Sequence, residues 1–156
     1  MFKKILQQLH QRLTSQKKTI AVAESCSGGQ LSEALTYLPG ASNYFLLGVV
    51  TYSNKSKKVI LNIPEKIIAK YGAVSRQVAI LMAQNIRKKA HTDLGLSITG
   101  IAGPAGATTT KPVGTVFIAL ANKNKTLCRL FLLPGKREYV RKKSVQAALR
   151  LLYKHI

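Results

Sequence analysis

The chain of 156 residues has very little negative charge, few aromatic side chains and no long apolar run. Only five residues are acidic against 25 lysines and arginines, which gives a formal net charge of +20. There is no tryptophan and aromatic residues make up 6%, which is sparse for a surface that stacks nucleic-acid bases. No apolar run reaches the roughly 18 residues of a membrane-spanning helix. We therefore expect a cytoplasmic protein without a membrane partner.

Cysteine and histidine are also scarce. Cys26 and Cys128 lie far apart, match no metal-ligand spacing and form no disulfide framework. The three histidines, His10, His91 and His155, are equally dispersed. We expect reduced thiols, no bound metal and no cofactor.

The excess of positive charge creates a field that attracts anions, whether nucleic acid, phosphorylated metabolites or anionic lipid. The basic residues are spread along the whole chain instead of being gathered in one arm. This spread favours a solvated basic surface over a specific partner. Nonspecific binding of nucleic acid stays open as an alternative, and so does self-association into a homo-oligomer.

Hydrophobic residues make up 46% of the chain, and their spacing alternates between strand and helix periods. The last two predicted strands have only residues 121–125 between them, which favours an antiparallel hairpin. We predict an α/β fold: a three-layer α/β/α sandwich with a mixed, mostly parallel sheet of about five strands, with residues 1–156 as a single domain. The predicted strands are 19–23, 45–52 (largely buried), 93–99, 113–120 and 126–133, and the predicted helices are 2–15, 30–39, a short one beginning within 53–58, 64–71, 75–90 and one beginning near 136.

Residues 23–29, Ala-Glu-Ser-Cys-Ser-Gly-Gly, follow an apolar strand and precede a helix. In open α/β sheets, the turn beyond the carboxyl end of a strand is where ligands bind. Ser25 is therefore a candidate nucleophile, and backbone amides near Ser27, Gly28 and Gly29 are candidates to hold an oxyanion. A simpler interpretation stays open, in which the glycines permit a sharp turn and Ser27 caps the helix.

Lys57 is the candidate base for Ser25, because each follows the end of a predicted strand. A lysine acts as a base only when neutral, so its pKa must fall from about 10.4 toward about 7–8. Burial and the like charges of Lys55 and Lys58 both favour such a fall. A hydrogen bond from Tyr52 is a candidate to orient the amine or the serine. Alternatively, the lysines form a solvated face and Tyr52 packs in its strand.

The loop Thr99-Gly100-Ile101-Ala102-Gly103-Pro104 follows the third predicted strand. Its amides at Gly100 and Gly103 and the Thr99 hydroxyl are candidates to hold a phosphate or a carbonyl. It is not a Walker loop, because no Gly-Lys-Ser/Thr follows, and its glycine spacing does not match a dinucleotide fingerprint either. Glycine loops are common, and the stronger observation is that three polar or glycine-rich loops each follow a predicted strand.

Five segments occur in order at residues 23–29, 50–54, 72–75, 99–104 and 111–116. Together they resemble the CinA C-terminal domain family, the competence/damage-inducible proteins, over about residues 6–152. The resemblance implies nicotinamide-nucleotide amidohydrolase activity, in which nicotinamide mononucleotide and water give nicotinate mononucleotide and ammonia. It also implies a serine nucleophile with a lysine partner, which match Ser25 and Lys57, with Tyr52 close by.

The same resemblance suggests where the substrate phosphate binds. Family members often carry Gly-Asp-Arg before the last helix, and this chain has Gly135-Lys136-Arg137 with Arg141 one turn later. Arg137 and Arg141 suit a phosphate because a guanidinium pairs with it bidentately. Alternatively, both are simply exposed residues of the first helical turns.

Two residues depart from the family pattern. Ala105 stands where Gly-Pro-Asp-Gly-Gly would place an aspartate, and Lys136 replaces another aspartate. These departures keep alternatives open beside the amidohydrolase: a family member that binds a nucleotide without hydrolysing it, or a nucleic-acid-binding protein linked to competence or DNA damage.

Overall fold

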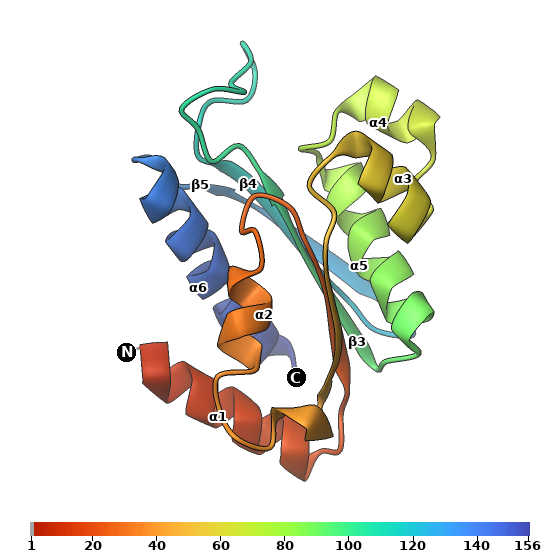
Figure 1. Ribbon diagram of the computed structural model, residues 1–156, viewed down its shortest axis with the longest axis vertical. Coiled ribbons are helices and arrows are strands. Elements are labelled where there is room, and N and C mark those ends of the chain that lie inside the picture. The colour runs from red at the N-terminus through yellow and green to blue at the C-terminus, as the bar shows by residue number, and fades with distance from the viewer. Residues whose placement is uncertain (1) are drawn as a thin grey trace.

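The computed structural model describes residues 2–156. It confirms the predicted alternation of strands and helices (Figure 1). The elements are α1 (Phe2–Ser15), β1 (Ile20–Glu24), α2 (Gln30–Leu35), the 3-10 turn η1 (Ala41–Asn43), β2 (Phe45–Val50), α3 (Asn54–Leu61), α4 (Glu65–Tyr71), α5 (Arg76–Ala90), β3 (Leu94–Gly100), β4 (Thr115–Ala121), β5 (Thr126–Leu132) and α6 (Arg137–His155).

The five strands form one sheet in the order β2-β1-β3-β4-β5. β1 pairs in parallel with β2 and with β3, whereas β4 is antiparallel to β3 and to β5. β4 therefore runs against the other four strands, and the predicted mixed, mostly parallel sheet is confirmed. Figure 1 shows α1, α2 and α6 on one face of the sheet and α3, α4 and α5 on the other, which gives three layers.

Each face of the sheet packs against its helices in a hydrophobic core, and successive residues of a strand point to opposite faces. Ile20 and Val22 of β1 pack with α1, α2 and α6, whereas Ala21 and Ala23 pack toward α3, α4 and α5. Small residues bring α5 close to the sheet. At Gly95 an added Cβ would collide with the carbonyl oxygen of Ala83, so the close approach requires glycine there.

β2 differs from the prediction. Residues 45–52 were expected to form a largely buried strand, but β2 is an edge strand with Leu46 51% and Val50 48% exposed. The prediction of burial is wrong because an apolar run does not reveal how many neighbours a strand has, and β2 has a neighbour on one side only. α2 is also shorter than predicted, since it ends at Leu35.

The sheet brings three strand ends together at one edge. Pairing continues beyond the strands, because the Ser25 amide donates to the Ile98 carbonyl at 3.0 Å and the Thr51 amide donates to the Glu24 carbonyl at 2.8 Å. Ser53 then caps α3 by accepting from the Ser56 amide at 3.0 Å, which starts that helix directly beside the edge.

Within residues 2–156, no helix is both long and apolar enough to cross a membrane.

Candidate active site

Ser25 and Lys57 meet at the carboxyl edge of the sheet. The Lys57 Nζ lies 3.1 Å from the Ser25 Oγ, within hydrogen-bond reach. Lys57 is only 1% exposed and Ser25 is 8% exposed. The turn after β1 therefore presents the serine, and the first turns of α3 present the lysine, as the sequence predicted.

Two backbone carbonyls hold the lysine amine. Nζ donates to the Thr51 carbonyl at 2.6 Å and approaches the Tyr52 carbonyl at 3.4 Å. In the neutral amine, two N–H bonds can serve these carbonyls while the lone pair faces the Ser25 hydroxyl. The backbone after β2 thus aims the amine at the serine.

Burial lowers the pKa of Lys57 from 10.5 to about 8, because desolvation disfavours the charged form. The like charges of Lys55 and Lys58, which the sequence suggested as a second cause, do not contribute. Lys58 forms an ion pair with Glu65 at 2.7 Å, and Lys55 is exposed to solvent. At pH 7 about a tenth of Lys57 is therefore neutral, and at pH 8 about half.

A buried carboxylate organises the serine turn. Glu24 is fully buried, and its Oε2 accepts from the Ser27 hydroxyl at 2.7 Å and from the Gly29 and Leu31 amides at 3.0 Å. Its Oε1 accepts from the Ser32 amide at 2.8 Å and the Ser32 hydroxyl at 2.7 Å. The N-terminus of α2 is thus occupied by a side chain of the protein itself. Sequence reasoning missed this residue, although a lone glutamate at a strand end was a usable signal.

The glycine amides are already used inside the turn. The Gly28 amide donates to the Ser25 carbonyl at 3.1 Å and the Gly29 amide donates to Glu24. The prediction that they cradle an oxyanion is corrected, since neither has a hydrogen left to donate. Ser27 does not cap α2 either, because Gly29 is the N-cap residue and the Ser27 hydroxyl points to Glu24. In the part of the chain that the structure describes, neither the Cys26 amide nor the Ser27 amide donates a hydrogen bond to another residue of this turn.

A cleft of about 250 Å³ opens over the serine and lysine. It includes most of the predicted site residues but not Ser27, Gly28, Gly29 or Arg141. The residues that line it are Ser25, Cys26, Tyr52, Lys57, Ala73, Val74, Thr99, Gly100, Ile101, Ala102, Gly103, Ala105, Gly106 and Arg137.

Tyr52 lies at the mouth of the cleft instead of beside the lysine. Its side chain is 57% exposed, and its hydroxyl accepts from the Arg137 Nη2 at 2.9 Å. Only its backbone carbonyl faces Lys57, so the prediction that the phenol orients the amine or the serine is wrong. Arg137 also donates to the Gly103 carbonyl at 3.0 Å and thereby places a cation at the mouth.

Arg141 packs against the serine turn and not in the cleft. Its Nη2 donates to the Ser27 carbonyl at 3.1 Å, and a Cβ added at Gly28 would lie 2.9 Å from that nitrogen. The predicted phosphate contact of Arg141 is therefore corrected, because its guanidinium fills the space behind the turn. Gly28 leaves the room that this guanidinium needs.

The glycine loop closes the site from the β3 side. The Thr99 hydroxyl is buried and donates to the Ala73 carbonyl at 2.9 Å, so its hydrogen is not free for a ligand. At Gly100 a Cβ would lie 3.0 Å from the Cys26 Sγ, which explains why this loop can pack so closely on the serine turn. Burial raises the pKa of the Cys26 thiol to about 11, so Cys26 stays protonated near neutral pH. Ser25 is the candidate nucleophile because the Lys57 Nζ lies 3.1 Å from its Oγ.

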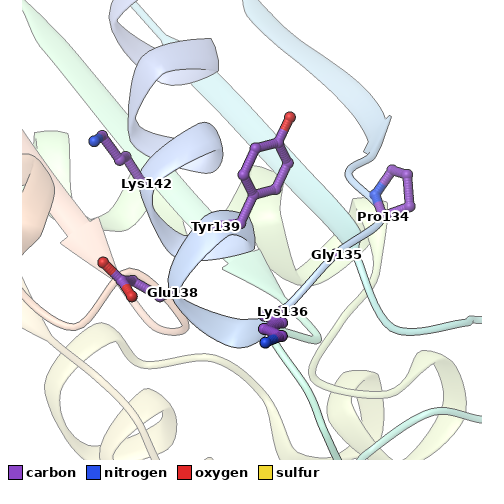
Figure 2. Close-up of a pocket in the computed structure, with 6 residues that line it drawn as sticks. All are labelled: Pro134, Gly135, Lys136, Glu138, Tyr139 and Lys142. Carbon is purple, nitrogen blue, oxygen red and sulfur yellow. The ribbon is translucent and has the colours of Figure 1, made fainter.

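A larger hollow of about 560 Å³ lies around the first turns of α6 (Figure 2). Its polar groups are the side chains of Lys136, Glu138, Tyr139 and Lys142, which Figure 2 shows spread around the helix instead of converging on one point. It contains no candidate nucleophile beside a base. The candidate active site is therefore the smaller cleft.

The fold and the site define an α/β protein with a buried serine–lysine pair at the carboxyl edge of a mixed sheet. The family model for the CinA C-terminal domain matches residues 2–156. The chain therefore belongs to the CinA C-terminal domain family.

Relatives and solved structures agree with this membership. The chain is 50% identical over 145 residues to a CinA-like protein of Syntrophus aciditrophicus, covering 92% of this chain and 34% of that protein. It is 48% identical over 144 residues to a CinA-like protein of Thermotoga neapolitana, covering 92% of this chain and 35% of that one. The chain thus spans about a third of the length of these curated relatives.

The crystal structure of the competence/damage inducible protein CihA from Agrobacterium tumefaciens is similar to this fold. The TM-score is 0.95 at 32% identity, covering 98% of this chain and 94% of that one. A CinA superfamily protein from Escherichia coli gives a TM-score of 0.94 at 32% identity, covering 99% of this chain and 90% of the other. The three-layer fold is therefore that of the family.

Proposed function

We propose that the protein is an amidohydrolase of pyridine nucleotide salvage that converts nicotinamide mononucleotide and water into nicotinate mononucleotide and ammonia. The observation that carries the proposal is the buried Lys57 amine, with its pKa lowered to about 8, lying 3.1 Å from the Ser25 hydroxyl. A nucleophile beside a base of matched pKa is the arrangement that acyl transfer needs. The resemblance to the CinA family supports the choice of substrate.

In the first half of the reaction, neutral Lys57 accepts the Ser25 proton as Oγ attacks the carboxamide carbon. A tetrahedral intermediate forms, and its oxyanion needs donors close to the serine. The Cys26 amide is our candidate donor, since Cys26 follows the nucleophile directly and lines the cleft. The protonated Lys57 then gives its proton to the leaving amine, and ammonia departs from the acyl-enzyme.

In the second half, water attacks the acyl carbon and Lys57 accepts its proton. The ester bond to Ser25 breaks, Oγ recovers a proton from Lys57, and nicotinate mononucleotide leaves. The lysine therefore acts as base and acid in turn, which a pKa near 8 permits at neutral pH.

The cleft is suited to the nicotinamide ring and carbonyl, with the ribose phosphate toward the mouth. Ala73, Val74 and Ala102 supply apolar contact, and Arg137 supplies the one cation at the entrance among the residues lining the cleft, besides the buried Lys57. A guanidinium pairs with phosphate through two parallel hydrogen bonds. Ala105 also lines this entrance, where its methyl group adds no hydrogen bond.

The test is to incubate the purified protein with nicotinamide mononucleotide and to measure ammonia. The proposal predicts release by the wild type and a fall of at least about 10³-fold in Ser25→Ala, because the variant lacks the nucleophile. No release by the wild type, or equal release by Ser25→Ala, would contradict the proposal.

A second candidate function is nonspecific binding of nucleic acid, favoured by a basic hollow of about 280 Å³ at the opposite edge of the sheet. The β4–β5 turn lies there, because Ala121 pairs with Gly95 at the start of β3. The hollow is lined by Gln84, Arg87, Lys88, Asn122, Lys123, Asn124, Lys125 and Thr126, and none of these is acidic. DNA affinity that falls steeply with salt, without sequence preference, would support this candidate. Affinity that does not change with salt would contradict it.

A further inference from the structure

Glu24 is a buried carboxylate that the proposed chemistry does not use. It is 0% exposed, and no lysine, arginine or histidine among residues 2–156 forms an ion pair with it. A buried charge without such a partner is costly unless hydrogen bonds replace its hydration. Five donors from Ser27, Gly29, Leu31 and Ser32 do so at 2.7–3.0 Å.

These five bonds cross the serine turn from end to end. Glu24 precedes Ser25 directly, and the groups that bind its carboxylate lie from three to eight residues further on. The carboxylate thus ties the end of β1 to the start of α2, and Ser25 lies inside the loop that it closes. The Gly28 amide, which donates to the Ser25 carbonyl, holds the loop from within.

The backbone of Glu24 reaches the lysine side of the site as well. Its carbonyl accepts from the Thr51 amide at 2.8 Å, and the Thr51 carbonyl accepts from the Lys57 Nζ at 2.6 Å. One residue therefore contacts both segments whose relative placement sets the 3.1 Å distance between Oγ and Nζ. It touches neither reacting atom through its side chain.

We propose that Glu24 is a positioning residue, whose side-chain carboxyl group holds the Ser25 Oγ against the Lys57 Nζ through the five bonds to the serine turn. This inference rests on the proposed hydrolytic function for its kinetic readout. The carboxylate suits the task because both of its oxygens only accept, and all five groups around it donate. A glutamine would place an NH₂ group against at least two of these donors and would displace the turn.

The matched pair of variants is Glu24→Gln and Glu33→Gln. Both remove one negative charge from the same short region, but Glu33 is exposed on α2 and none of the five bonds involves it. Each variant is first compared with the wild type in thermal unfolding and near-ultraviolet circular dichroism. Two readouts follow: the rate at which a fluorophosphonate labels Ser25, with loss of fluoride, and kcat and KM for nicotinamide mononucleotide.

Glu24→Gln is expected to lower the labelling rate and kcat by about 10²-fold, with KM within about threefold, because displacement by about 1 Å disrupts attack more than binding. Glu33→Gln is expected to match the wild type in both. Glu24→Asp, which keeps the charge but is one methylene shorter, is expected to lie between them. Wild-type labelling by folded Glu24→Gln would overturn the proposal.

If Glu24→Gln does not fold, Ser27→Ala and Ser32→Ala decide the question, since each removes one side-chain donor. A fall of about two- to tenfold in labelling at unchanged KM would support the positioning role, and wild-type rates in both would overturn it. If Ser25 of the wild type is labelled but no ammonia is released, only the proposed substrate, nicotinamide mononucleotide, is contradicted. The labelling rates of the variants then still test the positioning role of Glu24. A wild type whose Ser25 is not labelled would contradict both proposals.

Discussion

The two edges of the sheet are both polar, but they are built differently. At the carboxyl edge, Lys57 is buried and aimed by two carbonyls at Ser25. At the opposite edge, Lys88, Lys123 and Lys125 are exposed around an open hollow. The two edges therefore suit different tasks: a buried and oriented amine suits catalysis, whereas exposed lysines suit nonspecific attraction of anions.

The largest effect on this comparison is expected from Lys57→Met, which removes the amine and keeps most of the side-chain volume. The activity on nicotinamide mononucleotide is expected to fall by about 10²–10⁴-fold, the usual contribution of a positioned base. Steady-state kinetics on the folded variant measures it. Activity within threefold of the wild type would show that Lys57 is not the base of the reaction.

Lys57→Met also tests whether burial lowers the pKa of Lys57, through the pH dependence of the free energy of unfolding. The unfolded chain holds the lysine proton up to pH 10.5, but the folded protein releases it near 8. Between these values the unfolded state binds more protons, so folding gains stability from Lys57 as pH rises. The unfolding free energy of the wild type relative to Lys57→Met should therefore rise by about 3 kcal/mol between pH 7 and 11. A flat difference in denaturant titrations would contradict it.

A smaller effect is expected at the mouth of the cleft. Arg137→Ala should raise KM for nicotinamide mononucleotide by about 10–100-fold, the loss of hydrogen bonds to a charged group, and leave fluorophosphonate labelling of Ser25 unchanged. Lys142→Ala is the matched control, since it removes an exposed cation from the same helix outside the cleft. Equal KM values for the two variants would remove Arg137 from phosphate binding.

The smallest effect on hydrolysis is expected from the opposite edge. The double variant Lys88→Ala with Lys125→Ala should leave kcat and KM unchanged, because both side chains lie far from the strand ends that carry Ser25. If this edge binds nucleic acid, the slope of log affinity against log salt should fall by up to about two. A loss of hydrolysis in this variant would show that the two edges are coupled.

Much of this arrangement could be predicted from the sequence, because it depends on local periodicity. Strand–turn–helix order brought Ser25, Lys57 and the loop after β3 to one edge without any knowledge of contacts. The errors fell where hydrogen-bond partners decide the role of a group. The amides of Gly28 and Gly29 are occupied by partners that no spacing rule reveals.

The direction in which the Tyr52 and Arg141 side chains point could not be predicted from the sequence either. Tyr52 follows β2 at the right place, yet its phenol turns outward to Arg137. Arg141 lies one helical turn after Arg137, yet it turns back behind the serine turn to the Ser27 carbonyl. Glu24 went unassigned because a buried carboxylate held only by uncharged donors leaves no charged partner in the sequence to pair it with.

The central claim is that a lysine with a lowered pKa activates Ser25, and the pH dependence of kcat/KM for nicotinamide mononucleotide tests it most directly. Because the neutral amine is the active form, the rate should rise with pH through a midpoint near 8 and level off above it. The small residual activity of Lys57→Met should lack this midpoint. A wild-type rate that stays constant from pH 6 to 10, or a midpoint near 8 that persists in Lys57→Met, would contradict the account.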